Sequence, residues 1–317
     1  MNETERIEKI KEVGFQLRGS GYKDEVEYNK GNYTYQFWVL PERDVELETT
    51  PFYFNEKNDF IHFTSMESLN SILSSGNIRM YSLNNMDDQY EMSYAIEKYC
   101  FKKEFFEEND EKQHVYCFSM CPSELLKDET EEHTLWNIIG RKGNGAIIRF
   151  EFLNRNRWYN YHLSKIYYQE NEWLENIKSL NCSTTKEILD LKITGFLKNE
   201  IYSFEKEIRL LFDCRPKFST IITRNDKQIY PIVHLDKFIN KEKVSYFEMP
   251  LPQFIEDSSD FEIFDALRQK YEIPKIKINE IILGYRFSET DVLNLKQKLN
   301  FEKLGIKIYL SKLKKWY

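Results

Sequence analysis

The 317-residue sequence lacks several features that would assign it to a broad class at once. No segment approaches the roughly 20 consecutive apolar residues of a transmembrane helix. The start of the chain also lacks the basic and apolar stretches of a signal peptide. The formal net charge of -7 argues against broad electrostatic adhesion to nucleic acid or to an anionic membrane, although it allows a local basic groove. These absences favour a cytoplasmic protein with no membrane partner.

Cysteine is scarce and irregularly spaced. The five cysteines include no Cys-x-x-Cys pair. Cys117 and Cys121 lie four residues apart, but no matching pair of His or Cys follows downstream, so we expect no metal site. An odd number of unpaired cysteines is also typical of a reducing compartment.

Apolar and aromatic residues are plentiful. Hydrophobic residues make up 41% of the chain and aromatic residues 15%, which is enough to bury a core. The 21 tyrosines and 23 phenylalanines favour a β-rich structure with aromatic-lined clefts. Because 317 residues exceed the usual size of one domain, we expect a large domain or a core with an added segment.

The first 55 residues are predicted to form an N-terminal extension. Apolar periodicity predicts a helix near residues 7–17, and aromatic alternation at residues 28–39 predicts a hairpin. No residue in this extension points to catalysis. We therefore assign residues 1–55 to the extension and residues 56–317 to the functional domain.

A strand, a helix and a second strand are predicted at the start of that domain. Residues 60–63, Phe-Ile-His-Phe, predict a strand. Thr64 is followed by Glu67 at the spacing of a capping box, which predicts that Thr64 caps the helix. Gly76 supplies the stop signal. A strand at residues 78–82 follows directly.

The rest of the domain alternates strands with helices, which indicates a mixed α+β fold. The last lysines of the chain, within residues 312–315, are predicted to be a frayed terminus or, alternatively, a contact for an acidic partner. The remaining predicted strands are 114–120, 146–152, 163–168, 276–284, 306–310 and two within a loop-rich stretch, near Ile229 and Val244. The predicted helices are 130–139, 171–198 and one capped by Ser288.

A charged strand is predicted at residues 204–212. Because side chains two positions apart share a face of a strand, Glu205, Glu207 and Arg209 would point to the same side. One interpretation is a solvated face. The other is a cleft in which an arginine keeps a carboxylate ionised beside a polar substrate.

The order of short motifs resembles a bacterial family of unknown function that is similar to ADP-ribosyltransferases of the DarT and diphtheria-toxin type. The resemblance covers residues 59–311 and excludes the N-terminal extension. It is carried by Phe60-Ile61-His62-Phe63-Thr64-Ser65, Arg79-Met80-Tyr81-Ser82, Cys117-Phe118-Ser119, Leu135-Trp136, Gly145–Phe150, Glu205-Lys206-Glu207-Ile208-Arg209 and Ile278–Gly284.

This resemblance implies an ADP-ribosyltransferase-like split mixed β-sheet with flanking helices, binding NAD as its substrate. It implies a working set of His62, Tyr81 and Glu207, with Glu205 completing a Glu-x-Glu pair. Nicotinamide leaves from an oxocarbenium-like transition state, and a carboxylate such as Glu207 would stabilise the positive charge on the ribose. Glu205 would orient or deprotonate the acceptor. His62 would bind the adenosine ribose, and Tyr81 would stack on the nicotinamide.

Three further residues receive binding roles from the resemblance. Thr64 would assist His62, Ser119 would contact the nicotinamide region, and Arg209 would pair with a pyrophosphate oxygen or fix one of the acids. Each residue also has a structural alternative: a strand histidine for His62, a helix cap for Thr64, a core aromatic for Tyr81 and a strand hydroxyl for Ser119. For Arg209 the alternative is neutralisation of Glu205 across the surface.

The predicted function is therefore an NAD-dependent ADP-ribosyltransferase, acting as a toxin or an antiviral-defence effector on a protein or nucleic-acid acceptor. A neutralising protein partner would accompany such a toxin. Two alternatives remain open: a non-catalytic nucleotide- or partner-binding module of the same fold, and an enzyme that hydrolyses NAD.

Overall fold

The computed structural model describes residues 51–85, 115–153, 155, 158, 161–168, 195–213, 222–224, 227–229, 235–239, 242–255, 274–298 and 304–317. The predicted N-terminal helix and hairpin lie outside these residues. So does most of the helix predicted at 171–198, of which only residues 195–198 are described, and these are not helical.

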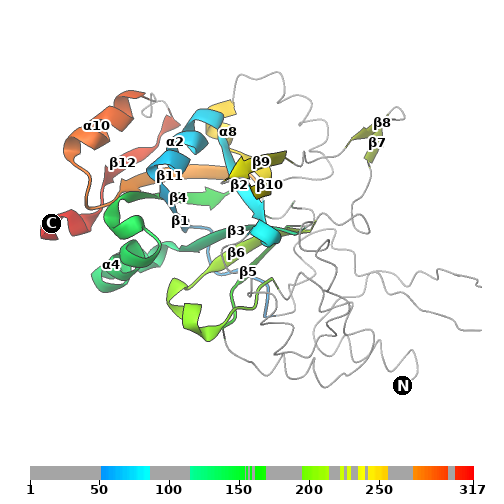
Figure 1. Cartoon of the computed structure of the whole chain (residues 1–317), viewed down its shortest axis with the longest axis horizontal. Helices are drawn as coiled ribbons and strands as arrows, with labels where there is room; N and C mark the ends of the chain where they lie inside the picture. Colours follow the sequence, from blue (N-terminus) through cyan, green and yellow to red (C-terminus); the bar gives the residue numbers. More distant parts are fainter. Residues whose placement is uncertain are drawn as a thin grey trace, which may run out of the picture.

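The described part of the chain contains short helices and a large set of strands (Figure 1). None of its helices combines the length and the apolar character that crossing a membrane requires. The strands are β1 (Phe60–Ser65), β2 (Asn77–Ser82), β3 (Val115–Pro122), β4 (Gly145–Phe152), β5 (Tyr161–Lys165), β6 (Ile208–Asp213), β7 (Ile222–Arg224), β8 (Lys227–Ile229), β9 (Leu235–Ile239), β10 (Glu242–Pro250), β11 (Ile276–Leu283) and β12 (Lys307–Leu310). The α-helices are α2 (Met66–Ser75), α4 (Glu129–Ile138), α8 (Pro252–Ile255) and α10 (Glu289–Lys298), and the 3₁₀ segments are η2 (Leu83–Asn85), η5 (Ser123–Lys127), η6 (Arg141–Gly143), η8 (Glu200–Glu205) and η9 (Lys312–Trp316).

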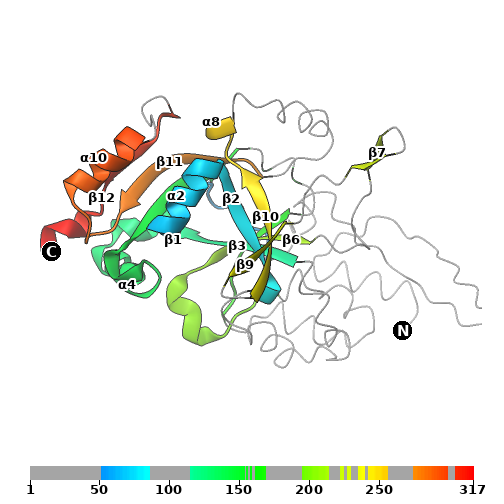
Figure 2. The ribbon, with the colours of Figure 1, turned by 45° about the horizontal axis from the view of Figure 1, so that its top comes forward.

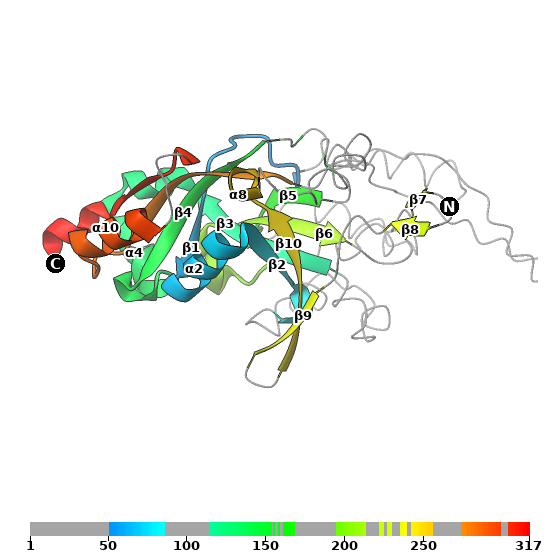
Figure 3. The same cartoon turned by 90° about the horizontal axis from the view of Figure 1, so that it is seen from above.

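Ten of these strands form one mixed sheet. Its main path runs β12-β11-β4-β1-β3-β2-β10-β9, and β6 joins it by pairing with both β3 and β5. The β11–β12 pair is parallel and the other pairs of the sheet are antiparallel. Figure 3 shows the β9–β10 hairpin extending away from the rest of this sheet. The prediction of a mixed α+β fold is therefore confirmed.

Helices pack on both faces of the sheet and enclose two apolar cores. The larger core joins one face to α2, α8 and α10, with Leu69, Ile72 and Val292 among its members. The smaller core joins the other face to α4 and η9, through Trp136 and Leu313. Figure 1 shows α2, α8 and α10 grouped together, away from α4.

The sheet splits along β3. β1 pairs with β3 at Cys121 and Pro122, whereas β2 pairs with it at Tyr116 and Cys117. Between these points, residues 118–120 pair with β6, and within the described residues they pair with neither β1 nor β2. Helix α2 connects the two diverging strands and lies over them (Figure 2).

Helix α2 begins one residue later than predicted. Its N-cap is Ser65, whose hydroxyl accepts a hydrogen bond from the backbone N–H of Ser68, so the prediction that Thr64 is the cap is wrong. Thr64 remains in β1 and pairs with Ala146, and this pairing keeps it in the extended conformation. Gly76 ends the helix with a φ of 67°, as predicted.

The predicted strand at residues 204–212 is wrong for its first half. Residues 200–205 form η8, which is capped by the side chain of Asn199, and β6 begins only at Ile208. Lys206 between them has a φ of 46°, a left-handed conformation that interrupts strand geometry. Strand alternation therefore does not place Glu205, and its position has to be read from its contacts.

The basic C-terminus is ordered against α4. Residues 312–316 form η9, and Leu313 is buried in the smaller core. The Nζ of Lys315 lies 2.6 Å from a carboxylate oxygen of Glu129. The prediction of a frayed terminus is wrong, because one buried leucine and this ion pair hold the segment in place.

The packed domain includes residues that precede position 56. Phe52 and Phe54 are buried. The Phe52 ring lies 4.9 Å from that of Tyr167 and 6.1 Å from that of Phe196, measured between centroids. Residues 52–54 therefore pack as part of the same domain as the sheet.

Candidate functional site

Two acidic and two positively charged side chains lie close together where the chain enters β6. Lys198 precedes η8, Glu205 ends it, Glu207 follows, and Arg209 is the second residue of β6. The Lys198 Nζ lies 2.8 Å from an oxygen of Glu205 and 3.2 Å from an oxygen of Glu207. We refer to Lys198, Glu205, Glu207 and Arg209 as the acid cluster.

Glu207 is the most tightly held member of the acid cluster. Arg209 donates to both of its carboxylate oxygens, from Nε at 2.9 Å and from Nη2 at 3.0 Å. Arg209 also donates from Nη1 to the carbonyl oxygen of Gly195 at 2.8 Å. The Glu207 side chain is 5% exposed and that of Arg209 is 1% exposed. A two-point contact of this kind fixes both the position and the orientation of the carboxylate.

The surroundings keep Glu207 ionised. Burial by itself raises the pKa of a carboxyl group, but the charges of Arg209 and Lys198 and a hydrogen bond from the Ser119 hydroxyl outweigh it. The pKa of Glu207 therefore lies below its ordinary value. Glu207 can act as a fixed negative charge, and it is unsuited to donating a proton at neutral pH.

Glu205 differs from Glu207 in its access to solvent. Its side chain is 19% exposed. Its backbone carbonyl oxygen lies 3.3 Å from the Sγ of Cys121. Of the two acids, Glu205 is the one that a second reactant can approach.

Tyr81 and Ser119 lie on the same face of the sheet as Arg209. Ser119 is directly opposite Arg209 in the β3–β6 pair, and Tyr81 is directly opposite Cys117 in the β2–β3 pair. Directly opposite residues share a face, and so do residues two apart on one strand. Both Tyr81 and Ser119 are partly exposed.

His62 and Thr64 lie on the other face. His62 is opposite Ile148 and Thr64 is opposite Ala146, and both partners belong to the larger core. The His62 Nδ1 lies 2.9 Å from the carbonyl oxygen of Ser119, which accepts its hydrogen bond. Burial lowers the pKa of His62, and this hydrogen bond offsets only part of that shift.

The predicted site residues therefore form two groups. Glu205, Glu207, Arg209, Ser119 and Tyr81 share one face, whereas His62 and Thr64 share the other. The two groups lie nearest each other at Ser119, which is directly opposite Arg209 in the β3–β6 pair and whose carbonyl oxygen lies 2.9 Å from Nδ1 of His62.

Two contacts of the acids were missed by sequence reasoning. Lys198 bridges Glu205 and Glu207, and the Tyr168 hydroxyl accepts a hydrogen bond from the backbone N–H of Glu207 at 3.0 Å. Tyr168 ends the predicted strand 163–168 and Lys198 ends the predicted helix 171–198, and neither residue belongs to a motif. Their contacts with the acids depend on how the chain approaches β6 from β5 and η8, which the predicted elements do not specify.

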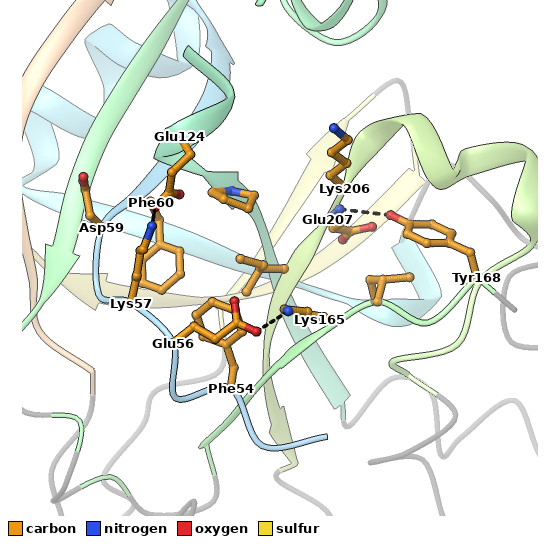
Figure 4. Close-up of a pocket in the computed structure, with 13 residues that line it drawn as sticks. Phe54, Glu56, Lys57, Asp59, Phe60, Glu124, Lys165, Tyr168, Lys206 and Glu207 are labelled. Atoms are coloured by element: carbon orange, nitrogen blue, oxygen red, sulfur yellow. Dashed lines mark hydrogen bonds and ion pairs between the residues drawn. The ribbon is translucent and has the colours of Figure 1, made fainter. Parts of the chain in front are cut away.

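A cavity of about 260 Å³ adjoins Glu207 (Figure 4). Its lining includes Glu207 and, within the described residues, none of the other six predicted site residues. We call it the Tyr168 pocket. It is lined by Phe54, Glu56, Lys57, Asp59, Phe60, Pro122, Glu124, Lys165, Ile166, Tyr168, Lys206, Glu207 and Ile208.

Two further searches, for metal-binding clusters and for similar proteins, assign no function to this site. In the part of the chain that the structure describes, no three His, Cys, Asp or Glu side chains gather in a way that could hold a metal ion. Comparison of the chain with protein-family models, curated proteins and solved structures finds no match.

Proposed function

We propose that this chain is an NAD-dependent ADP-ribosyltransferase that acts through Glu207. The observation that carries the proposal is the Glu207 carboxylate, which is fixed by Arg209, kept ionised, and adjacent to the partly exposed Ser119. The split of the sheet along β3 supports it, because the resemblance of the sequence implies a split mixed sheet.

The chemistry requires a fixed negative charge. The bond between nicotinamide and ribose breaks, its electron pair leaves with nicotinamide, and positive charge develops on the ribose. A carboxylate that is already ionised and oriented stabilises this charge without reorganising during the reaction. The acceptor nucleophile then bonds to the same ribose carbon and loses its proton to Glu205, the more exposed acid.

The contacts and positions of the other predicted site residues favour one role for each of them. Arg209 donates to Glu207 and to the Gly195 carbonyl and is 1% exposed, which favours fixing the acid over binding a pyrophosphate. Tyr81 is the aromatic surface on the same face and would stack on the nicotinamide. His62 acts in this proposal as a positioning residue that holds Ser119, and Thr64 supports the same strand.

The acceptor and the biological role are part of the proposal. The acceptor is a protein or a nucleic acid, and the enzyme serves as a toxin or an antiviral-defence effector with a neutralising protein partner. These assignments rest on the resemblance of the sequence alone.

A second function, a non-catalytic nucleotide- or partner-binding module, is favoured by one observation. Both oxygens of Glu207 already accept hydrogen bonds from cations within the chain. An acid that is satisfied in this way can hold the start of β6 in place without contacting a substrate. Substrate turnover separates this function from the transferase.

The test is incubation of the full chain with NAD labelled in its ADP-ribose part, in the presence of cell extract. Transfer of label to a macromolecule supports the transferase, release of free ADP-ribose identifies an NAD-hydrolysing enzyme, and the absence of turnover favours the binding module.

The matched variants are Glu207→Gln and Glu280→Gln. Glu280 also accepts a hydrogen bond from an arginine, at 3.0 Å from Nη1 of Arg149, but it lies in β11 on the other part of the sheet. We expect Glu207→Gln to lower turnover by about a hundredfold or more, as for the loss of an electrostatic transition-state contact, and Glu280→Gln to keep it. Full activity of Glu207→Gln would exclude Glu207 as the key acid.

A further inference from the structure

The Tyr168 pocket has apolar and aromatic walls. Phe54 and Phe60 contribute rings whose centroids lie 5.8 Å apart, and Pro122, Ile166 and Ile208 contribute aliphatic surface. Figure 4 shows Phe54 and Phe60 on one side of the pocket, and the lining also includes residues at the end of β5 and the start of β6. A volume of about 260 Å³ with such walls suits a flat ring system of one or two rings.

The charged residues at the rim of this pocket are already matched. Each of the seven charged lining residues has an oppositely charged partner. A charged ligand would find no unmatched counter-charge among these lining residues, whereas an uncharged ligand would leave the pairs intact. The pairs are Lys57 with Glu124, Lys165 with Glu56, Asp59 with Arg149, Lys206 with Glu131, and Glu207 with both Arg209 and Lys198.

One polar group at the pocket can direct a ligand. The Tyr168 hydroxyl accepts the backbone N–H of Glu207 and points toward it in Figure 4, so the hydroxyl proton is available for donation. Burial, together with the charges of Glu207 and Glu205, raises the pKa of Tyr168. The hydroxyl therefore keeps its proton at neutral pH and acts as a donor.

We propose that the Tyr168 pocket binds a small uncharged aromatic ring carrying a carbonyl or ring-nitrogen acceptor, which receives a hydrogen bond from Tyr168. A pyridine carboxamide and a nucleobase both have this chemistry. The assignment rests on the walls, the matched charges and the donor, and it does not require transferase activity.

The experiment titrates the full chain with nicotinamide, adenine and nicotinate, and detects binding by ligand-observed saturation-transfer NMR. We expect at least one of the two neutral rings to bind, and the anionic nicotinate to bind about tenfold more weakly than nicotinamide or not at all. The tighter binder of the two neutral ligands shows whether the pocket prefers a pyridine carboxamide or a nucleobase. No binding of either neutral ring, or equal binding of nicotinate and nicotinamide, overturns the proposal.

Two variants locate the binding site. Tyr168→Phe removes the hydrogen bond to the ligand together with the one that the hydroxyl accepts from the backbone N–H of Glu207, and it is expected to weaken binding of the neutral ring about five- to tenfold. The control Tyr309→Phe removes a hydroxyl that bonds to Glu280, away from the pocket, and should leave binding unchanged. If Tyr168→Phe and the unaltered chain bind the neutral ring equally well, the ring does not bind in the Tyr168 pocket as proposed.

A variant at one partly exposed lining residue tests whether the matched charges of the pocket select an uncharged ligand. Glu124, whose side chain is 31% exposed, is the ion-pair partner of Lys57, so Glu124→Gln leaves an unmatched lysine at the pocket. Nicotinate should then bind about two- to fivefold more tightly, as expected for one partly exposed ion pair. Unchanged nicotinate binding would show that the matched charges do not select the ligand. Because this test reads binding alone, its failure is distinguishable from loss of NAD turnover.

Discussion

The two parts of the sheet each contain an arginine that bonds to carboxylates, in opposite environments. In the acid cluster, Arg209 and Glu207 are 1% and 5% exposed. At the other part of the sheet, Arg149 bonds to Asp59 and Glu280, and its side chain is 36% exposed. We refer to Asp59, Arg149 and Glu280 as the surface triad.

The distances alone do not separate the acid cluster from the surface triad. Arg209 contacts Glu207 at 2.9 and 3.0 Å, and Arg149 contacts Asp59 at 2.6 Å and Glu280 at 3.0 Å. The difference lies in desolvation, because a buried charge that loses its partner cannot turn to water. Burial therefore makes the acid cluster a more rigid and more sensitive element than the surface triad.

The largest difference is expected for loss of the arginine. Arg209→Met leaves Glu207 buried with Lys198 as its remaining charged partner, and should lower the free energy of unfolding by about 3–5 kcal/mol. The measurement is urea unfolding at neutral pH. Arg149→Met is the control and should cost at most about 1 kcal/mol. Equal losses in the two variants would mean that burial does not distinguish the two sites.

Lys198→Met should have an intermediate effect. It removes one donor from Glu207 and one from Glu205, but the two-point contact with Arg209 remains. We expect a loss of about 1–3 kcal/mol in the same unfolding experiment. A loss as large as that of Arg209→Met would identify Lys198, and not Arg209, as the main partner of Glu207.

The pH dependence of stability should also report on Glu207. Its pKa in the folded chain is lowered from an ordinary value of 4.5, so it stabilises the fold above pH 4.5. This contribution is lost as the pH falls from 4.5 through the folded pKa. Below pH 4.5, the unfolding free energy of the unaltered chain should therefore fall more steeply than that of Glu207→Gln. Parallel curves would show that the pKa of Glu207 is not lowered by folding.

The smallest effect is expected from salt at the surface triad. Its charges are partly exposed, so raising the ionic strength screens them more than it screens the acid cluster. The difference in unfolding free energy between Arg149→Met and the unaltered chain, at most about 1 kcal/mol, should shrink at 1 M salt. The corresponding difference for Arg209→Met should persist. A salt-sensitive Arg209→Met would place the acid cluster in contact with solvent.

Much of the fold could be predicted from local patterns. The strand–helix–strand unit from β1 to β2 follows from an apolar run, helical spacing and Gly76. The same reasoning located β3, β4 and β11 from runs rich in apolar residues, and α4 from a short segment that carries Leu135, Trp136 and Ile139. The start of β6 escaped it, because Asn199 and Lys206 impose a turn within a segment whose side chains also alternate like those of a strand.

The candidate site was only partly predictable. The sequence brought Glu205, Glu207 and Arg209 together through strand alternation, whereas η8 and Lys198 are what gather them in the structure. The face of His62 could not be read from its strand, because apolar residues stand on both faces of β1. Because β1 is buried on both faces, its residue pattern does not show which face a given side chain occupies.

Residue types and local periods, visible in the chain itself, determined the mixed α+β class and the closeness of two acids to an arginine. Only the tertiary structure decided that Lys198 bridges those acids, that His62 lies on the opposite face, and that the Tyr168 pocket adjoins Glu207. The reason is physical. Local patterns report the conformation of a few neighbouring residues, whereas burial, charge pairing and the face of a strand depend on segments that are distant along the chain.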